Sequence, residues 1–151
     1  MSQTGLEVFD KTFHKTNEWL QDVMEELHTD DRKYAYRVLR ASLHALRDRI
    51  TVAEAADLGA QLPMLIRGFY YEGWKPGATP TGDDLQEFLE RIQSGMEDQP
   101  GVPDPRRWAQ ASFAVLARHV DPGEIEDVIG ILPEEIRTLW PEPAGTEGGA
   151  R

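Results

Sequence analysis

The sequence predicts an all-α protein of about eight helices, arranged as two tandem helical repeats that pack about a pseudo-twofold axis into one compact domain. Three observations lead to this prediction. Apolar residues recur at steps of three and four along most of the chain, which is the period of an α-helix. Ser, Thr, Asp or Pro stands where most of these runs begin, as is typical of helix starts. The chain also resembles itself when it is shifted by 70 residues.

The first helix is expected over about residues 5–27. Its apolar side chains recur at steps that return them to one face. Thr4 and Glu7 have the spacing of a capping box at its start. A second helix is expected after the turn 29–31, because the aspartates there favour a helix N-terminus. Its apolar residues continue at helical spacing toward Ile50.

These two helices carry opposite charges. The first ends in an acidic stretch made of Glu18, Asp22, Glu25 and Glu26. The second has a basic face made of Arg32, Lys33, Arg37, Arg40, Arg47 and Arg49. Because a short turn makes the helices antiparallel neighbours, the opposite charges can meet across the hairpin. The favoured interpretation is that both groups are solvated surface, since exposed ion pairs contribute little.

Two shorter helices complete the first repeat, which spans about residues 5–73. Thr51 and Glu54 have the spacing of a second capping box. Pro63 stands where a first helical turn tolerates its missing N–H group. A third helix is therefore expected from Thr51 and a fourth from Pro63. Residues 75–83 are rich in turn-forming Pro, Gly and Thr, and they are the predicted connector between the repeats.

The second repeat spans about residues 84–140 and follows the same order. A fifth helix is expected directly after the connector. The sixth, seventh and eighth helices are expected to begin near Asp104, Asp121 and Pro133. The single helical domain therefore covers residues 1–140.

The end of the chain carries no helix signal. Residues 141–151 contain no apolar side chain larger than alanine. Such a segment buries too little surface to offset its conformational entropy. We predict that it is a disordered tail.

The shift of 70 residues aligns helix starts as well as apolar positions. It places Glu54 on Glu124 and Pro63 on Pro133. Because these residues mark the third and first positions of helices, the match indicates a repeated architecture rather than repeated hydrophobicity alone. Two such units, each with an apolar face, pack most simply against each other about a pseudo-twofold axis.

A charged pair recurs at the bend between the two short helices of each repeat. Asp57 and Arg67 are ten residues apart, and so are Asp127 and Arg137. We predict that each pair forms an ion pair that clamps the Leu-Pro bend. The alternative is that the two arginines together face an anionic ligand, in a pocket between the repeats.

Aromatic residues crowd the end of the predicted fourth helix. The segment 68–75 contains four of them, whereas the second repeat has fewer at the corresponding place. Tyr70, Tyr71 and Trp74 are candidates for a surface that binds a partner or a ligand, although Tyr70 also fits the core face of its helix. The alternative is that the aromatic rings pack over the connector and the opposite repeat.

Two long runs of the sequence resemble a known family. The run 16–76 contains the stretch GAQLPMLIRGFYYEGW, and the run 113–141 reads FAVLARHVDPGEIEDVIGILPEEIRTLWP. With the connector, they resemble the domain-of-unknown-function family 2267 over about residues 16–141. The resemblance implies a helical protein of bacterial or archaeal type. It implies no reaction and no catalytic residue.

Patterns typical of catalysis, cofactors and metals are absent from the sequence. There is no cysteine, no Gly-x-Ser-x-Gly elbow and no glycine-rich phosphate loop. Glu25 and His28 have the spacing of a di-iron ligand pair, but such a site needs a second pair and two further carboxylates from facing helices. The second repeat offers no matching histidine. We therefore predict no catalytic residue, no metal site and no cofactor.

Charge and composition limit the partners and the location. The formal net charge of -11 disfavours binding to nucleic acid or to an anionic membrane. The N-terminus lacks the basic start and apolar core of a signal peptide, and no stretch reaches the roughly 20 apolar residues of a membrane span. A chain without cysteine suits a reducing compartment. These features predict a cytoplasmic protein.

Two functions remain open. The absence of catalytic, cofactor and metal-binding patterns favours a non-enzymatic protein-interaction or regulatory module. Such a module would be monomeric or homodimeric and would bind an unidentified protein partner. The alternative is a small-molecule-binding protein or an enzyme whose pocket lies between the two repeats.

Overall fold

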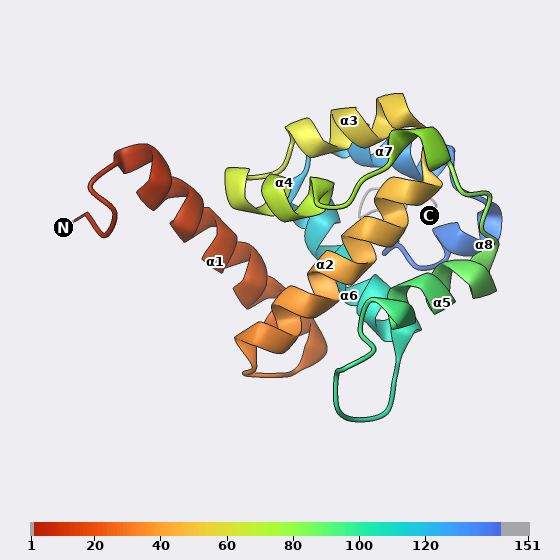
Figure 1. Ribbon diagram of the computed structural model, residues 1–151, viewed down its shortest axis with the longest axis horizontal. Helices are drawn as coiled ribbons and strands as arrows, with labels where there is room; N and C mark the ends of the chain where they lie inside the picture. Colours follow the sequence, from red (N-terminus) through yellow and green to blue (C-terminus); the bar gives the residue numbers. More distant parts are fainter. Residues whose placement is uncertain (1, 143–151) are drawn as a thin grey trace, which may run out of the picture.

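Helices make up the described part of the chain, which covers residues 2–142 of a computed structural model (Figure 1). They are α1 (Glu7–Leu27), α2 (Arg32–Arg49), α3 (Val52–Ala60), α4 (Met64–Tyr71), a 3-10 helix η1 (Pro76–Ala78), α5 (Leu85–Ser94), α6 (Pro105–His119), α7 (Pro122–Gly130) and α8 (Glu134–Arg137). Residues 2–142 contain no strand, so the all-α prediction is confirmed. Most of the predicted tail, residues 143–151, lies outside the described residues. Over the described range, none of the helices has the length and hydropathy needed to cross a membrane.

Local sequence signals account for most of the helix starts. Aspartates precede four helices and accept hydrogen bonds from main-chain N–H groups of the first turn; these are Asp31, Asp84, Asp104 and Asp121. Thr51 caps α3 in the same way, by accepting a hydrogen bond from the N–H of Glu54 at 3.1 Å. Pro63 and Pro133 each stand one residue before a helix rather than at its first position. The predicted starts are thus correct to within about a residue.

The start of α1 differs from the prediction. The helix begins at Glu7, after Leu6, and no side chain caps it. The Thr4 hydroxyl donates to Asp10 Oδ1 at 2.9 Å and accepts from the N–H of Leu6 at 3.1 Å. The predicted Thr4–Glu7 capping box is therefore wrong, because the carboxylate of Asp10, one turn further on, takes the Thr4 hydroxyl.

The centre of the molecule is α2, which contacts α1, α4, α5 and α6. In turn, α6 packs against both α1 and α2, and α3 lies beside α7 (Figure 1). Small side chains at Ser42 and Ser112 are buried on α2 and α6, and the Ser42 hydroxyl donates to the carbonyl oxygen of Trp108 in α6 at 3.4 Å. The first half of α1 extends away from this body, whereas its second half joins the core (Figure 1).

The helix boundaries repeat at the shift seen in the sequence. Both ends of α7 lie 70 residues after the ends of α3, and α8 starts 70 residues after α4. Residues 51–68 and 121–138 also have the same succession of buried, half-buried and exposed positions, with one difference at Gly59 and Ile129. In contrast, α5 is much shorter than α1, and residues 7–15 of α1 have no helical counterpart in the second half.

Two glycines in this region are expected to respond in opposite ways to alanine. A Cβ atom at Gly59 would overlap the hydroxyl and ring of Tyr71, whereas a Cβ at Gly68 would meet open space. We expect Gly59→Ala to lower the free energy of unfolding by about 1–2 kcal/mol through overpacking. Gly68→Ala is expected to raise it by about 0.5–1 kcal/mol, because alanine favours a helix interior. Urea unfolding measures both changes, and equal effects at the two sites would contradict this packing.

Candidate functional site

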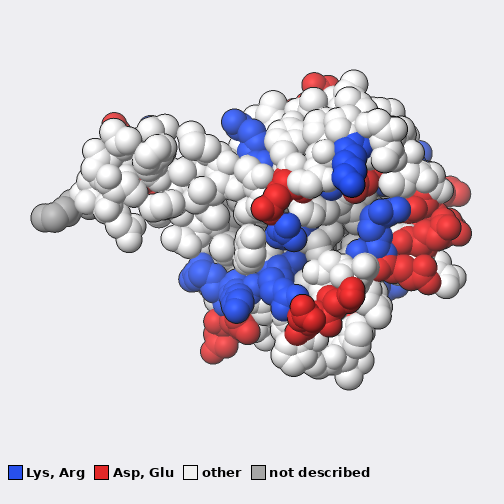
Figure 2. Space-filling view, in the orientation of Figure 1, with Lys and Arg blue, Asp and Glu red and all other residues white. Residues whose placement is uncertain are grey.

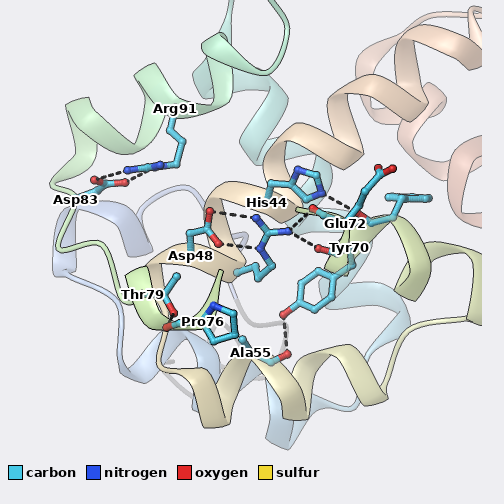
Figure 3. Close-up of polar contacts among 11 residues, drawn as sticks. His44, Asp48, Ala55, Tyr70, Glu72, Pro76, Thr79, Asp83 and Arg91 are labelled. Atoms are coloured by element: carbon cyan, nitrogen blue, oxygen red, sulfur yellow. Dashed lines mark hydrogen bonds and ion pairs between the residues drawn. The ribbon is translucent and has the colours of Figure 1, made fainter. Parts of the chain in front are cut away.

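The aromatic segment at the end of α4 is largely turned inward. Tyr70 is fully buried, and its hydroxyl donates to the carbonyl oxygen of Ala55 in α3 at 2.7 Å (Figure 3). Tyr71 and Trp74 are half-buried, with their rings 5.2 Å apart, and the Tyr71 ring borders Gly59. Tyr70 is therefore core, which contradicts its prediction as part of a binding surface. Tyr71 and Trp74 offer only part of their rings to a partner.

Two side chains of α2 hold this segment in place. His44 Nε2 lies 2.6 Å from the carbonyl oxygen of Phe69. Arg47 Nη1 donates to the carbonyl oxygens of Tyr70 and Glu72, at 2.7 and 2.9 Å (Figure 3). Burial lowers the pKa of His44, so its ring is neutral near pH ~7 and Nε2 carries the proton that is donated. Together they satisfy the carbonyl groups that the C-terminal end of α4 leaves without helical partners.

The two elbow arginines have similar contacts, all to main-chain carbonyl oxygens, but not the predicted ones. Arg67 donates to the carbonyl oxygens of Gly59 and Leu62, at 3.0 and 2.8 Å. Arg137 donates to those of Leu132 and Gly130, at 2.8 and 3.1 Å. Each arginine therefore caps the short helix before its own bend.

The aspartates at these bends stay apart from the arginines. Among the ion pairs of the described residues, neither Asp57–Arg67 nor Asp127–Arg137 occurs. The predicted ion-pair clamps are therefore wrong, and each bend is held instead by hydrogen bonds from the arginine side chain to main-chain carbonyl oxygens. Because both guanidinium groups are engaged at their own bends, the contacts give no support to a shared anion site between Arg67 and Arg137.

The acidic end of α1 meets α6 rather than α2. Asp22 Oδ2 lies 2.6 Å from His119 Nε2, and Arg118 pairs with both Asp22 and Glu26. The His119 ring also stacks on Trp19, with ring centroids 4.7 Å apart. Asp22 and Glu26 therefore pair neither across the α1–α2 hairpin, which the sequence allowed, nor with solvent alone, which it favoured. Their partners are on α6, which comes from the other half of the chain and lies beside α1.

The basic residues of α2 divide into an inner and an outer group. Arg47 is 4% exposed and Arg49 donates to the carbonyl oxygen of Asp83, so both belong to the interior and its edge. Lys33, Arg37 and Arg40 lie on the outer face, where they line a pocket of about 280 Å³ with Tyr36 and Gly95. We call these five residues the basic pocket.

A pair of carboxylates faces across the α3–α7 contact. Glu54 and Glu124, which the repeat aligns, each have a buried Oε2 atom without a hydrogen-bond donor in the described structure. Oxygens of Glu54, Asp57 and Glu124 all lie within 4.8 Å of one another, and Asp127 adds negative charge nearby. We call Glu54 and Glu124 the carboxylate pair.

Burial and this crowding raise the pKa of Glu124 to about 8. Two carboxylates this close disfavour being ionised together, and one proton satisfies both buried oxygens. The same cluster is the part of the described structure whose oxygens could share a divalent cation. Glu25 and His28, the metal-like pair of the sequence, are both exposed, and His28 ends α1 in the left-handed conformation.

Six of the nine exposed large apolar side chains of the described residues lie at the protruding end of α1 and the start of α4. They are Leu6, Val8, Phe9, Phe13, Met64 and Leu65. We call these six residues the α1 surface. Leu6, Phe9 and Phe13 are 52%, 43% and 37% exposed. The N–H of Leu65 donates to Thr12 Oγ1 at 3.2 Å, which joins the start of α4 to the middle of this half of α1.

Sequence reasoning missed the α1 surface. The spacing of its apolar residues matches that of the buried residues further along α1, so periodicity alone cannot distinguish a covered face from an uncovered one. One signal was available, because the first helix is longer than the fifth helix with which the repeat aligns it. Residues 7–15 of α1 have no helical counterpart in the second half, so the repeat gives no packing partner for them.

Comparison with known families agrees with this anatomy. The family model described as an uncharacterized conserved protein (DUF2267) matches residues 16–139. The match covers the body of the molecule and leaves out residues 7–15 of α1. No curated protein matches the chain. Because the matched region includes most of the sequence, the chain belongs to the DUF2267 family of uncharacterised conserved proteins.

Proposed function

We propose that this protein is a non-enzymatic interaction module that binds a helix of a protein partner on the α1 surface. The observation that carries the proposal is the continuation of one apolar helix face beyond the body of the molecule. Trp19, Leu20, Val23, Met24 and Leu27 bury this face in the second half of α1. In the first half the same face is exposed, and it holds two of the five phenylalanines of the chain.

The α1 surface has the composition of a docking site. Its viewed face is almost free of charged side chains, in contrast to the rest of the molecule (Figure 2). Large aromatic side chains contribute strongly where they become buried at an interface. Contiguous apolar patches of this kind are uncommon on monomers and mark interaction sites.

A helix is the partner element that fits this geometry. Leu6, Phe9 and Phe13 follow one another at steps of three and four residues, which is the spacing of a helix–helix contact. The start of α4, where Met64 and Leu65 are exposed, is joined to this half of α1 through Thr12, and in our proposal it is the second wall of the site. An amphipathic helix laid between two such walls buries its own apolar face.

The proposal includes the duplicated architecture. A pseudo-twofold axis through the α2–α6 and α3–α7 contacts would relate the two halves. The repeated helix boundaries, the contacts of α1 with α6 and of α5 with α2, and the facing of Glu54 with Glu124 all support it. The expected setting is the prokaryotic cytoplasm, which the absence of cysteine supports.

Site-specific crosslinking in native cells tests the docking proposal. A photo-crosslinking amino acid replaces Phe9 in the full chain, and the control carries it at Val102, which is 91% exposed on the loop between α5 and α6. The expected result is one protein crosslinked from position 9 and not from position 102. Capture of a second copy of this chain would replace the proposal with self-association. Equal capture from both positions would contradict it.

Binding of the identified partner to purified protein supplies the quantitative test. Phe9→Asp is expected to weaken the affinity by about 10–100-fold, because it places a charge in the centre of the apolar contact. Val102→Asp is the matched control and is expected to leave the affinity unchanged. Urea unfolding should be the same for both variants, since both positions are exposed. Unchanged binding by Phe9→Asp would exclude the α1 surface as the docking site.

A further inference from the structure

We infer that the partner helix is acidic along the flank that lies over α2, so that the basic pocket and the α1 surface form one bipartite binding face. This inference rests on the proposed function and adds the charge of the partner to it. It follows from three features of the described residues, namely the cluster of cations on the outer face of α2, the continuity of the two surfaces and the charge of the rest of the chain.

The basic pocket presents three cations on one helix face. Lys33, Arg37 and Arg40 are spaced four and three residues apart, which puts them side by side on the outside of α2. Gln99 accepts from Arg37 Nη1 at 3.0 Å, and Glu72 accepts from Arg40 Nη2 at 2.7 Å. These contacts orient the guanidinium groups and leave other N–H donors of both arginines for a ligand. Of the acidic residues of α1, Asp22 and Glu26 pair with α6, and Glu18 pairs with His14 and Lys15 within α1.

The basic pocket and the α1 surface are joined by the outer side of α4. At one end, Leu65 contacts Thr12 of α1 through its N–H group. One turn later, the Phe69 ring meets the Tyr36 ring of the basic pocket edge to face, with centroids 5.1 Å apart. At the other end, Glu72 pairs with Arg40. A partner that crosses α4 therefore contacts both surfaces.

Figure 2 shows this continuity on one face of the molecule. The almost uncharged protruding end of α1 adjoins a continuous group of Lys and Arg atoms over the first half of α2. Both surfaces are visible in the same view, so one ligand can cover them together.

Because the rest of the chain is acidic, the cations of α2 are the place where an acidic partner is attracted. With a formal charge of -11, the protein as a whole repels acidic molecules, and the cations of α2 are a local exception. An acidic segment is attracted only where it meets α2, which sets its orientation on the α1 surface as well as its affinity. A nucleic acid offers charge without an apolar face, so it leaves the α1 surface uncovered. An acidic amphipathic helix covers both.

Selection from a displayed library of helices tests this inference on the purified full chain. The library is an amphipathic helix in which the apolar face and both flanks are randomised. We expect the recovered helices to carry Asp or Glu on one flank and large apolar residues at steps of three and four. Lys33→Glu combined with Arg37→Glu is expected to weaken their binding about 10-fold or more, with a smaller loss at high salt.

The control is Lys75→Glu combined with Arg106→Glu, which changes the net charge equally at two exposed cations outside both surfaces. It is expected to retain binding within about twofold. A second test pair, Lys33→Gln with Arg37→Gln, removes charge without reversing it and is expected to give an intermediate loss.

The outcomes separate the inference from the proposed function. Recovered helices that lose binding to Phe9→Asp but show no acidic flank would overturn the inference and leave the docking proposal standing. Helices that bind Phe9→Asp as well as the unmodified protein, or no enriched helix at all, would overturn the docking proposal itself. Equal losses in the α2 variant and in its charge-matched control would attribute the effect to net charge and would also overturn the inference.

Discussion

Replacing Arg47 with methionine is expected to lower the free energy of unfolding by about 3–5 kcal/mol, the largest effect of any charged residue of α2. Arg47 is 4% exposed and donates to the carbonyl oxygens of Tyr70 and Glu72. It also pairs with Asp48, through Nε at 2.8 Å and Nη2 at 3.2 Å (Figure 3). Methionine roughly fills the volume but donates nothing, so buried acceptors and the Asp48 carboxylate lose their partner.

Arg40→Met is the matched control for this prediction. Arg40 stands on the same helix and also pairs with a carboxylate, but its partner Glu72 is exposed. Exposed pairs contribute about 0–1 kcal/mol, so the control should change stability little. Urea unfolding of both variants at one pH measures the difference. Similar losses at the two sites would contradict the role of Arg47 as the residue that holds the end of α4.

Glu124→Gln is expected to stabilise the protein in alkaline solution by about 2 kcal/mol and to leave it nearly unchanged in acid. The pKa of Glu124 is raised in the folded protein from an ordinary value of 4.5 to about 8. The folded state therefore binds a proton that the unfolded state has lost, and stability falls as the pH rises between these two values. Glutamine mimics the protonated carboxyl group and can donate to Glu54 at every pH.

Urea unfolding at pH ~5 and pH ~9 checks this prediction. The unmodified protein should lose stability between the two conditions, and Glu124→Gln should lose markedly less. Glu126→Gln is the control, since Glu126 is exposed on the same helix, and it should follow the unmodified protein. A pH dependence that is the same in Glu124→Gln and in the unmodified protein would exclude the shared proton.

A divalent cation on the same cluster predicts the opposite sign. If a cation held by Glu54, Asp57 and Glu124 were needed for stability, Glu124→Gln would destabilise the protein in alkaline solution, because it would remove a ligand. The unfolding series with and without a chelator therefore distinguishes the two readings of the carboxylate pair.

The sequence contained a signal for the carboxylate pair, but this signal was not recognised. The shift of 70 residues aligns Glu54 with Glu124, and both were interpreted as helix-start residues. Thr51 does cap α3, but the Glu54 side chain lies beside Glu124. Two residues that the repeat aligns contact each other only if they lie close to the proposed twofold axis. The sequence aligns Glu54 with Glu124 but does not show where the axis passes.

Most helix starts were determined by the local sequence. Asp31, Asp104 and Asp121 cap their helices through bonds to residues two or three positions away, and Pro63 and Pro133 act on their immediate neighbours. Such interactions are local, so they can be predicted without any knowledge of the fold. The all-α class and the spacing of the two halves followed from them.

The tertiary structure decided which faces meet. Whether Asp22 pairs with α2 or with Arg118, whether Tyr70 is core or surface, and whether the face of Phe9 is covered all depend on how helices far apart in the sequence cross. Helical periodicity reports that a face is apolar but not what covers it, because the covering element comes from elsewhere in the chain or from another molecule. For Leu6, Phe9 and Phe13 in the first half of α1, the described chain supplies only partial cover.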